Sequence, residues 1–287
     1  MIEVIAQAIP LAIVAAVPLL LAVEGEVIVQ RGGIINLGIE GMMLTAAMAA
    51  VAGAQASGSV LAGFCSGIAG AAAIAILFGV FTIHLRADQI VTGTAINFLA
   101  LGVTGFVYRE MQQGSLFVPS VAHASARAQN GVVILAWIVI PSALAFGLWK
   151  TRSGLRLRAC GENPEAVTSS GASVPMHRWA ALLIEAALVG LAGADLSLAL
   201  STGFAENMTA GRGFIALSIV IFGRWKVRGA LIGTALFGAA EALQFALQAA
   251  TSGVQFHLLL AVPYVVTLLI LCGVAGRVRA PEALGRP

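Results

Sequence analysis

Long apolar runs separated by short polar stretches dominate this chain. The stretch 41–83 contains no charged residue, and a helix that crosses a membrane needs about 20 apolar residues. This stretch therefore predicts two helices, and the small, turn-forming residues of 53–59 predict the break between them. Along the whole chain, the same reasoning predicts helical membrane segments at 4–23, 34–53, 60–83, 89–108, 131–149, 179–201, 213–223, 229–250 and 256–274.

Two stretches do not fit a simple membrane crossing. The stretch 30–41 is rich in glycine and also carries Asn36 and Glu40, and the segment 213–223 is too short to span comfortably. Each is either a broken or re-entrant helix or a tight loop at the membrane surface. Non-helical backbone at membrane depth is tolerated only where protein or a water-filled cavity surrounds it, and broken helices commonly line the route in transporters.

The composition excludes a soluble globular domain. Hydrophobic residues make up 59% of the 287 residues and charged residues 10%, whereas soluble domains have about 45–50% and about 25%. The fold class is therefore an all-α integral membrane protein. We expect a single transmembrane domain over 1–287, a multi-span bundle of about 8–10 membrane segments with some broken or re-entrant. Met1-Ile2-Glu3 lacks the basic start of a signal peptide, so the first segment is interpreted as a membrane helix.

The basic residues predict how the chain is oriented in the membrane. With a cytoplasmic C-terminus, 13 of the 16 Lys and Arg residues fall on the cytoplasmic side and three, Arg109, Arg127 and Arg212, fall outside. Cytoplasmic loops carry an excess of Lys and Arg, so this orientation is preferred and places the long polar loop 150–178 in the cytoplasm. The same bias explains the net charge of +3 without a nucleic-acid partner.

The sequence carries none of the usual catalytic or metal-binding signatures. It contains no GxxxxGK[ST] loop, HExxH, GxSxG or paired CxxC. Its four histidines are scattered without a second ligand at metal spacing, and its three cysteines are widely separated. We therefore predict no catalytic residue, no metal site and no disulfide framework.

Polar residues inside the predicted segments need partners or a cavity. Four acids lie in or near segments, and none has an evident Lys or Arg partner within the membrane: Glu40, Glu185, Asp195 and Glu241. Glu185 could reach the cytoplasmic interface, while Asp195 either bridges helices or lines the route. Amide side chains offer both a donor and an acceptor and suit a neutral solute. The predicted solute pathway comprises Asn36, Glu40, Gln89, Thr92, Asn97 and Gln244.

The loop 150–178 contains a predicted short helix. Asn163 precedes Pro164 and Glu165 at a first helical turn, and Gly171 follows as a terminator. A capped helix on the cytoplasmic side is a contact element for another protein. The alternative is an ordinary interhelical loop with one turn of helix.

Three stretches of this chain resemble a known family. They are Arg31-Gly-Gly-Ile-Ile-Asn-Leu-Gly-Ile-Glu-Gly-Met-Met43, Leu85-Arg-Ala-Asp-Gln-Ile-Val-Thr-Gly-Thr-Ala-Ile-Asn97 and the segment from Gly161-Glu-Asn-Pro-Glu-Ala to Gly171. Gly211-Arg-Gly-Phe-Ile-Ala-Leu and Phe222-Gly223 extend the match. The chain resembles the permease subunits of bacterial ABC importers of the ribose, branched-chain amino acid and nucleoside type. It is most similar to nucleoside permeases that work with a lipoprotein-type receptor, although Gln30 and Gly32 replace an acidic residue and a serine usual in the family.

The resemblance implies a function and a set of partners. It implies a type II-like importer permease, multi-pass in the bacterial inner membrane, that moves a small hydrophilic solute, most closely a nucleoside, by alternating access. A ribose-like sugar, a branched-chain amino acid or an autonomous secondary transporter are the alternatives. The implied partners are a cytoplasmic ATP-binding subunit, a second homologous permease in a heterodimer, and an extracytoplasmic solute-binding lipoprotein or periplasmic protein. This chain would bind no cofactor, since the partner ATPase uses the ATP. The residues expected to couple to it are Gly161, Glu162, Asn163, Pro164, Glu165, Ala166 and Gly171.

Overall fold

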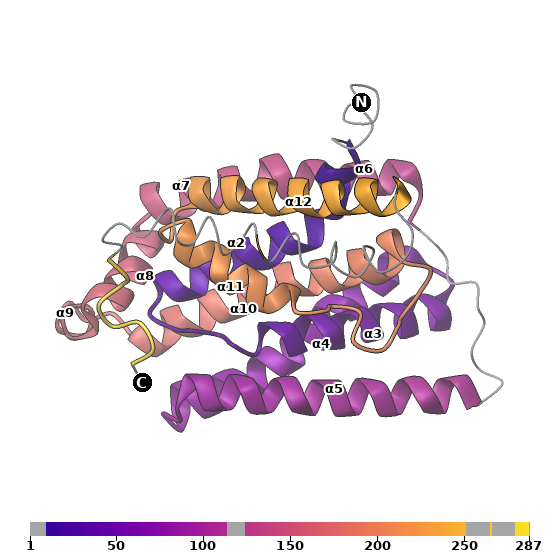
Figure 1. Ribbon diagram of the computed structural model, residues 1–287. Helices are drawn as coiled ribbons and strands as arrows, with labels where there is room; N and C mark the ends of the chain where they lie inside the picture. The colour runs from indigo at the N-terminus through magenta and orange to yellow at the C-terminus, as the bar shows by residue number, and fades with distance from the viewer. Residues whose placement is uncertain (1–9, 114–123, 251–264, 266–278, 287) are drawn as a thin grey trace.

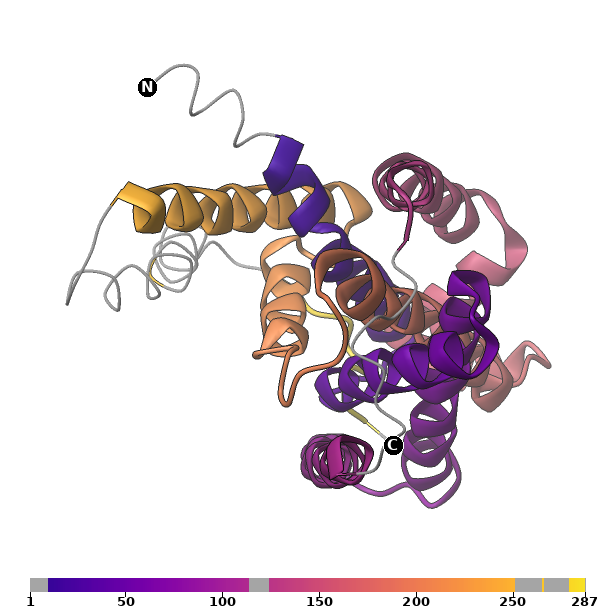
Figure 2. The ribbon, with the colours of Figure 1, turned by 90° about the vertical axis from the view of Figure 1, so that its right-hand side faces the viewer.

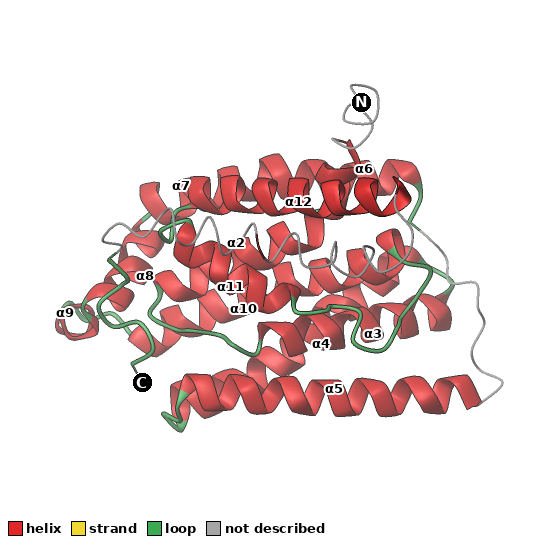
Figure 3. Ribbon diagram, viewed as in Figure 1, coloured by secondary structure: helices red, strands yellow, loops and turns green. Residues whose placement is uncertain are grey.

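The computed structural model of the chain describes residues 10–113, 124–250, 265 and 279–286. This part consists of helices, turns and loops, without a strand (Figure 3). By length and composition, five of its helical stretches could cross a membrane. The α-helices are α2 (Val17–Arg31), α3 (Ile39–Ser57), α4 (Val60–Gly79), α5 (Gln89–Gln113), α6 (Ala126–Ile134), α7 (Ile140–Lys150), α8 (Arg152–Glu162), α9 (Pro164–Ser169), α10 (Val174–Asp195), α11 (Arg212–Phe222) and α12 (Val227–Ala250).

Helix α2 forms the centre of the bundle (Figures 1 and 2). Its residues from Val17 to Gln30 are all buried, and it packs against α10, α11, α12, α7 and α8. A helix that is apolar around its circumference belongs in such a position. The predicted end of the first segment at residue 23 was wrong: the helix continues through Glu24 and Glu26 to Arg31, because these acids lie inside the protein.

Helices α3, α4 and α10 pack against one another beside α2. Small residues make this packing close. A Cβ added to Gly190 of α10 would lie 2.5 Å from the Cα of Ile68, so a larger residue would force the two helices apart. Close approach through small residues is a common way for membrane helices to associate.

The outer helices present apolar side chains to their surroundings. On α5, Phe98 is 72% exposed and Phe106 is 66% exposed, and this helix lies at the edge of the bundle (Figure 2). Large exposed apolar side chains would be unfavourable in water but suit a helix that faces lipid. The predicted multi-span membrane bundle is therefore confirmed.

Some predicted boundaries were wrong for identifiable local reasons. Helix α3 begins at Ile39 rather than near residue 34, because residues 32–38 are not helical. Helix α10 begins at Val174, where the hydroxyl of Ser173 accepts a hydrogen bond from Met176 N. The loop 150–178 contains a helix that was not predicted, α8. The break within 53–59 is confirmed at Gly58, which ends α3 with φ +66°. The predicted segment 256–274 lies outside the described residues, apart from residue 265.

Candidate translocation and coupling site

The connection between α2 and α3, residues 32–38, is not helical and lies largely buried within the bundle. Figure 1 shows it running from the end of α2 to the start of α3. The N–H groups of its first three residues donate to backbone carbonyls of α2, and three later N–H groups donate to side chains. Ile35 N donates to Gln89 Oε1 (2.7 Å), and Asn36 N donates to Glu26 Oε1 (3.3 Å). Gly38 N donates to Asn36 Oδ1 (3.0 Å). This is how a protein accommodates non-helical backbone inside a membrane bundle.

Asn97 of α5 binds the end of the 32–38 segment that leads into α3. Its Nδ2 donates to Leu37 O, and its Oδ1 accepts from Gly41 N, both at 2.8 Å. An amide side chain is suited to this position because it donates and accepts at once. A Cβ added to Gly93 would stand 2.7 Å from Gly38 N, so this glycine allows α5 to reach the segment.

Two carboxyl groups meet beneath this segment. Glu26 of α2 and Glu185 of α10 are fully buried, and both accept hydrogen bonds from Asn36, through its backbone N–H and its side chain respectively. Gln30 Nε2 donates to Glu26 Oε1 (2.7 Å), and Asn36 Nδ2 donates to Glu185 Oε2 (2.9 Å). The prediction that Glu185 reaches the cytoplasmic interface was therefore wrong.

The sequence analysis missed Glu24, Glu26 and Gln30 as buried polar residues, because it ended the first segment before them. The sequence does contain a signal that the helix continues past these acids. Residues 27–29 are apolar, and the glycines that mark the helix end, Gly32 and Gly33, come only after them. Glu24 is 1% exposed, and among the residues that the structure describes neither of its carboxyl oxygens has a hydrogen-bond partner.

Glu40 holds the start of α11. Its two carboxylate oxygens accept hydrogen bonds from Gly211 N (2.8 Å) and Gly213 N (2.6 Å). A Cβ on Gly213 would stand 2.7 Å from Glu40 N, so only glycine allows this approach. The N-terminus of a helix carries a partial positive charge and binds anions. In this protein an internal carboxylate occupies that position.

The structure brings together four of the six predicted pathway residues, Asn36, Glu40, Gln89 and Asn97, around the 32–38 segment. The other two lie apart from this cluster. The hydroxyl of Thr92 donates to Asp88 O (2.7 Å) within its own part of the chain. Gln244 is buried on α12, which packs mainly on α2, α7 and α11.

One of the predicted unpaired acids has a cationic partner. Arg212 Nη2 donates to Glu241 Oε1 at 2.8 Å, and both side chains are largely buried. The expectation that Glu241 lacks an Arg partner was therefore wrong. Arg212 had been counted as a residue of an outside loop, but it is the first residue of α11. Asp195, by contrast, is 2% exposed, and its Oδ1 has no hydrogen-bond partner within the described part of the chain.

Helices α8 and α9 project at one end of the bundle (Figure 1). The predicted short helix is confirmed as α9: Asn163 Oδ1 accepts from Ala166 N (3.1 Å), Pro164 starts the first turn, and Gly171 follows with φ +78°. Within α9 only Val167 is buried. Of the residues expected to couple to an ATPase, Gly161 is buried, and Glu162, Asn163, Glu165, Ala166 and Gly171 are exposed.

The C-terminal residues Pro281–Arg286, which we call the clasp, connect this projecting element to the 32–38 segment. Ala283 N donates to Gly161 O (2.8 Å), and Gly285 N donates to Gly33 O (3.1 Å). The carbonyl of Arg286 accepts hydrogen bonds from Arg178 Nη2 (3.1 Å) and Gln89 Nε2 (3.4 Å). The clasp thus joins the end of α8, the 32–38 segment, and the starts of α5 and α10. No pattern in the sequence predicts this role.

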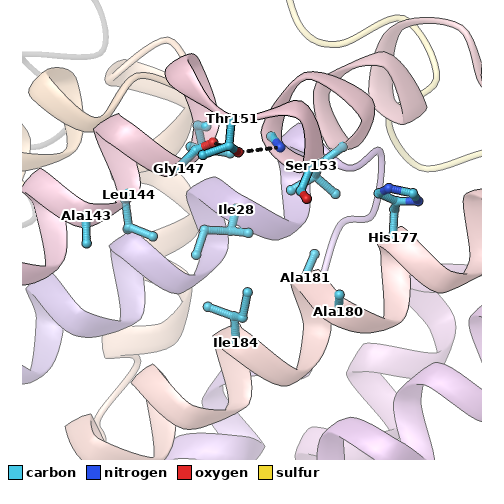
Figure 4. Close-up of a pocket in the computed structure, with 13 residues that line it drawn as sticks. Ile28, Ala143, Leu144, Gly147, Thr151, Ser153, His177, Ala180, Ala181 and Ile184 are labelled. Carbon is cyan, nitrogen blue, oxygen red and sulfur yellow. Dashed lines mark hydrogen bonds between the residues drawn. The ribbon is translucent and has the colours of Figure 1, made fainter.

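A crevice of about 290 Å³ lies between α7, α8 and α10 (Figure 4). Its walls are mainly apolar and include Ile28, Leu144 and Ile184, with Thr151 and His177 toward one end. Thr151 caps α8 by accepting from Gly154 N (3.0 Å). Helix α8 therefore borders a crevice on one side, while its Gly154 packs closely against Gly147 and Leu148 of α7.

Comparison with known proteins finds permease components of transport systems. The family model described as "Branched-chain amino acid transport system / permease component" matches residues 7–271. The nucleoside ABC transporter permease protein NupC of Lactococcus lactis is 33% identical, over 93% of this chain and 92% of its own length. The guanosine ABC transporter permease protein NupQ of Bacillus subtilis is 32% identical, over 100% and 97%. A Haloferax volcanii protein named "Putative glucose ABC transporter permease protein TsgC13" is 35% identical, over 80% and 74%. No solved structure matches the chain significantly.

Proposed function

This chain is a permease component of an ABC transporter and belongs to the family of branched-chain amino acid transport system permeases, and we propose that its solute is a nucleoside. Membership of this family makes it a multi-pass inner-membrane protein that transports rather than catalyses. It also implies a separate ATPase subunit and a substrate-binding partner. The nucleoside proposal depends on the similarity to two nucleoside permeases over nearly the whole chain.

The position of Glu40 favours an uncharged solute. In transporters, the N-terminus of a broken helix often receives an anionic group of the substrate. Here the carboxylate of Glu40 already accepts from the first N–H groups of α11, and it would repel a second anion. A nucleoside has no negative charge, whereas an amino acid carries a carboxylate and a nucleotide carries a phosphate. This argument does not separate a nucleoside from a neutral sugar, so the sugar named for the Haloferax relative is the second candidate.

We place the solute route beside the 32–38 segment, between this permease and a second, homologous one in a heterodimer. Asn36, Gln89 and Asn97 hold this segment through hydrogen bonds to its backbone, so their first role is to fix the wall of the route. A few weak polar contacts suffice for a solute that must also be released. Thr92, half-buried on α5, lies between Gln89 and Asn97 along this helix, and we assign it to the same wall of the route.

We propose that α9 contacts the ATPase, and that this end of the bundle therefore faces the cytoplasm. The helix is exposed, capped and attached through one buried residue, Val167. Closure of the ATPase pair would push on α9 and move α8, and the crevice beside α10 provides space for that shift. The movement would reach the 32–38 segment through Gly161, which contacts both Gly33 and the clasp. Rocking of one helical element against another is a common route to alternating access.

Uptake of radiolabelled solutes in cells tests this proposal. In a strain that retains the ATPase and the binding protein, removing this gene should abolish nucleoside uptake and leave ribose and leucine uptake intact. Removing the ATPase gene alone should have the same effect, because the permease has no energy source of its own. Loss of ribose uptake instead would identify a sugar permease. Nucleoside uptake that survives without the ATPase would identify a secondary transporter and refute the coupling proposal.

A further inference from the structure

A groove with both cationic and apolar walls lies where α7 ends and α12 begins. It has a volume of about 500 Å³ and lies outside the proposed solute route and the coupling contacts. Its walls come from the last turns of α7 and from the corner between α11 and α12. The lining residues are Ala145, Phe146, Trp149, Lys150, Lys226, Val227 and Arg228.

Among the described residues, the charged side chains that line this groove are all positive. They are Lys150, Lys226 and Arg228, and all three are exposed. Neither of the two ion pairs found among the described residues involves these three cations. Helix α12 begins at Val227, so the partial positive charge of its N-terminus adds to theirs. An anionic ligand would therefore meet three cations and no opposing charge.

Two further cations stand beside the same groove. Arg158 lies over the ring of Trp149 at 4.2 Å from its centroid, and Arg31 lies at 5.6 Å. These contacts hold the indole at the edge of the groove and raise the local positive potential. Tryptophan is enriched at the headgroup level of membranes, which agrees with a site at the boundary between lipid and water.

The connection between α11 and α12, which carries Lys226 and Arg228, has a backbone conformation fixed by its contacts. Arg224 and Trp225 both adopt left-handed backbone conformations, with φ of 55° and 54°, which persist only where the surroundings impose them. Arg31 Nε donates to Trp225 O (2.7 Å), and Trp225 Nε1 donates to Gln30 Oε1. The adjoining Lys226 and Arg228 therefore extend from a preformed backbone that is anchored to the central helix α2.

The apolar wall lies next to the cations along α7. Phe146 is 64% exposed and precedes Lys150 by one turn, about 6 Å along the helix axis. We propose that this groove binds an anionic phospholipid of the cytoplasmic leaflet, with its phosphate at the three cations and an acyl chain along Ala145 and Phe146. Basic pockets between helices on this side of a membrane are suited to acidic headgroups. The proposal rests on the orientation given under the proposed function.

Native mass spectrometry of the purified transporter complex tests this proposal without any transport step. The complex is titrated with phosphatidylglycerol and, separately, with phosphatidylcholine. The wild type should retain phosphatidylglycerol preferentially. The variant Lys150→Gln/Lys226→Gln/Arg228→Gln should bind phosphatidylglycerol roughly a hundredfold more weakly, since each cation near the surface contributes about 1 kcal/mol. A control variant, with the exposed cations Arg152, Arg156 and Arg279 replaced by Gln, should bind it as the wild type does.

Three outcomes would overturn the proposal. The groove would not be selective for an anionic lipid if the wild type bound both lipids equally, or if the triple variant and the control variant lost phosphatidylglycerol binding equally. Displacement of the lipid by equimolar glycerol 1-phosphate would mean that the ligand is a soluble phosphate. Loss of the ATPase subunit from the triple variant alone would make the groove a protein interface.

A second measurement uses a chain with the cations intact, in case the triple variant does not fold. Brominated phosphatidylglycerol should quench Trp149 fluorescence more than brominated phosphatidylcholine does, with Trp149→Phe as the reference. Equal quenching by the two lipids would also overturn the proposal. Because neither measurement depends on import, failure of the nucleoside proposal would leave both results unchanged.

Discussion

Replacing Gly161 by alanine would separate the projecting element α8–α9 from the 32–38 segment. A Cβ at this position would overlap the carbonyl oxygen of Arg31 and stand 3.1 Å from the nitrogen of Gly33. Both neighbours are backbone atoms, so no side chain can turn away. The contact must open by roughly 1 Å before carbon and oxygen reach their ordinary separation of about 3.3 Å.

The free-energy cost of this substitution is large enough to reduce import but small compared with the free energy of unfolding. Overpacking of a close contact costs about 1–3 kcal/mol, while a folded protein is typically stable by about 5–15 kcal/mol. The Gly161→Ala protein should therefore fold and assemble. If the cost falls on the coupled state, import should decrease by about 5- to 150-fold. ATP hydrolysis should persist, because the exposed face of α9 is unchanged.

Proteoliposomes that contain the complete transporter allow import and ATP hydrolysis to be measured in the same sample. Gly102→Ala is the matched control, because this glycine of α5 has no atom within 4 Å of an added Cβ; it should import as the wild type does. Full import by Gly161→Ala would refute the proposed path through this contact. Loss of both import and the bound ATPase would show that Gly161 serves only assembly.

Four other changes test separate parts of the structure. Ending the chain before Pro281 removes the clasp and its backbone hydrogen bonds, so import should fall while ATP hydrolysis continues in proteoliposomes. Glu40→Gln removes the charge at the start of α11 and one of two acceptor oxygens, so thermal unfolding should show a loss of about 1–2 kcal/mol. Asn97→Ala leaves two backbone groups unpaired and should cost about 1–3 kcal/mol in the same measurement. Burial raises the pKa of the Cys160 thiol above its usual 9.0, so less thiolate is present at neutral pH. In a variant that keeps only Cys160, maleimide should therefore label this thiol slowly, and the labelling rate should still rise above pH 9.

Each of these expectations has a result that contradicts it. Normal import by the truncated chain would remove the clasp from the coupling path. Unchanged unfolding of Glu40→Gln would mean that the helix end needs no carboxylate. If the Asn97→Ala protein were as stable as the wild type but did not support uptake, Asn97 would contact the solute rather than hold the 32–38 segment in place. Rapid labelling of Cys160 at neutral pH would show that α8 exposes its buried side.

The sequence predicted the elements whose signals are local. Runs of apolar residues gave most of the long helices, and the order Asn163, Pro164, Gly171 gave the capped helix α9, because a cap, a first turn and a terminator are read from neighbours. Gly58 likewise marks the end of α3 through its left-handed backbone. Such features require no knowledge of what packs against them.

The sequence could not predict features that depend on contacts between distant residues. Glu24 and Glu26 lie inside a buried helix because other helices surround it, and a local hydropathy rule ends the helix at the first charge. The pairing of Arg212 with Glu241 joins two helices, and the clasp joins residues more than 100 positions apart. Asn97 could be identified as a polar residue in an apolar helix, but its two backbone partners follow only from the fold.

The most direct test of the account is ATP-driven accumulation of labelled guanosine and uridine in proteoliposomes that contain this permease, its ATPase, its binding protein and the second permease. We expect accumulation that requires ATP on the side of α9. Unlabelled nucleosides should compete, whereas ribose, leucine and nucleoside 5′-monophosphates should not. Accumulation of leucine or of a monophosphate, or nucleoside entry without ATP, would contradict it.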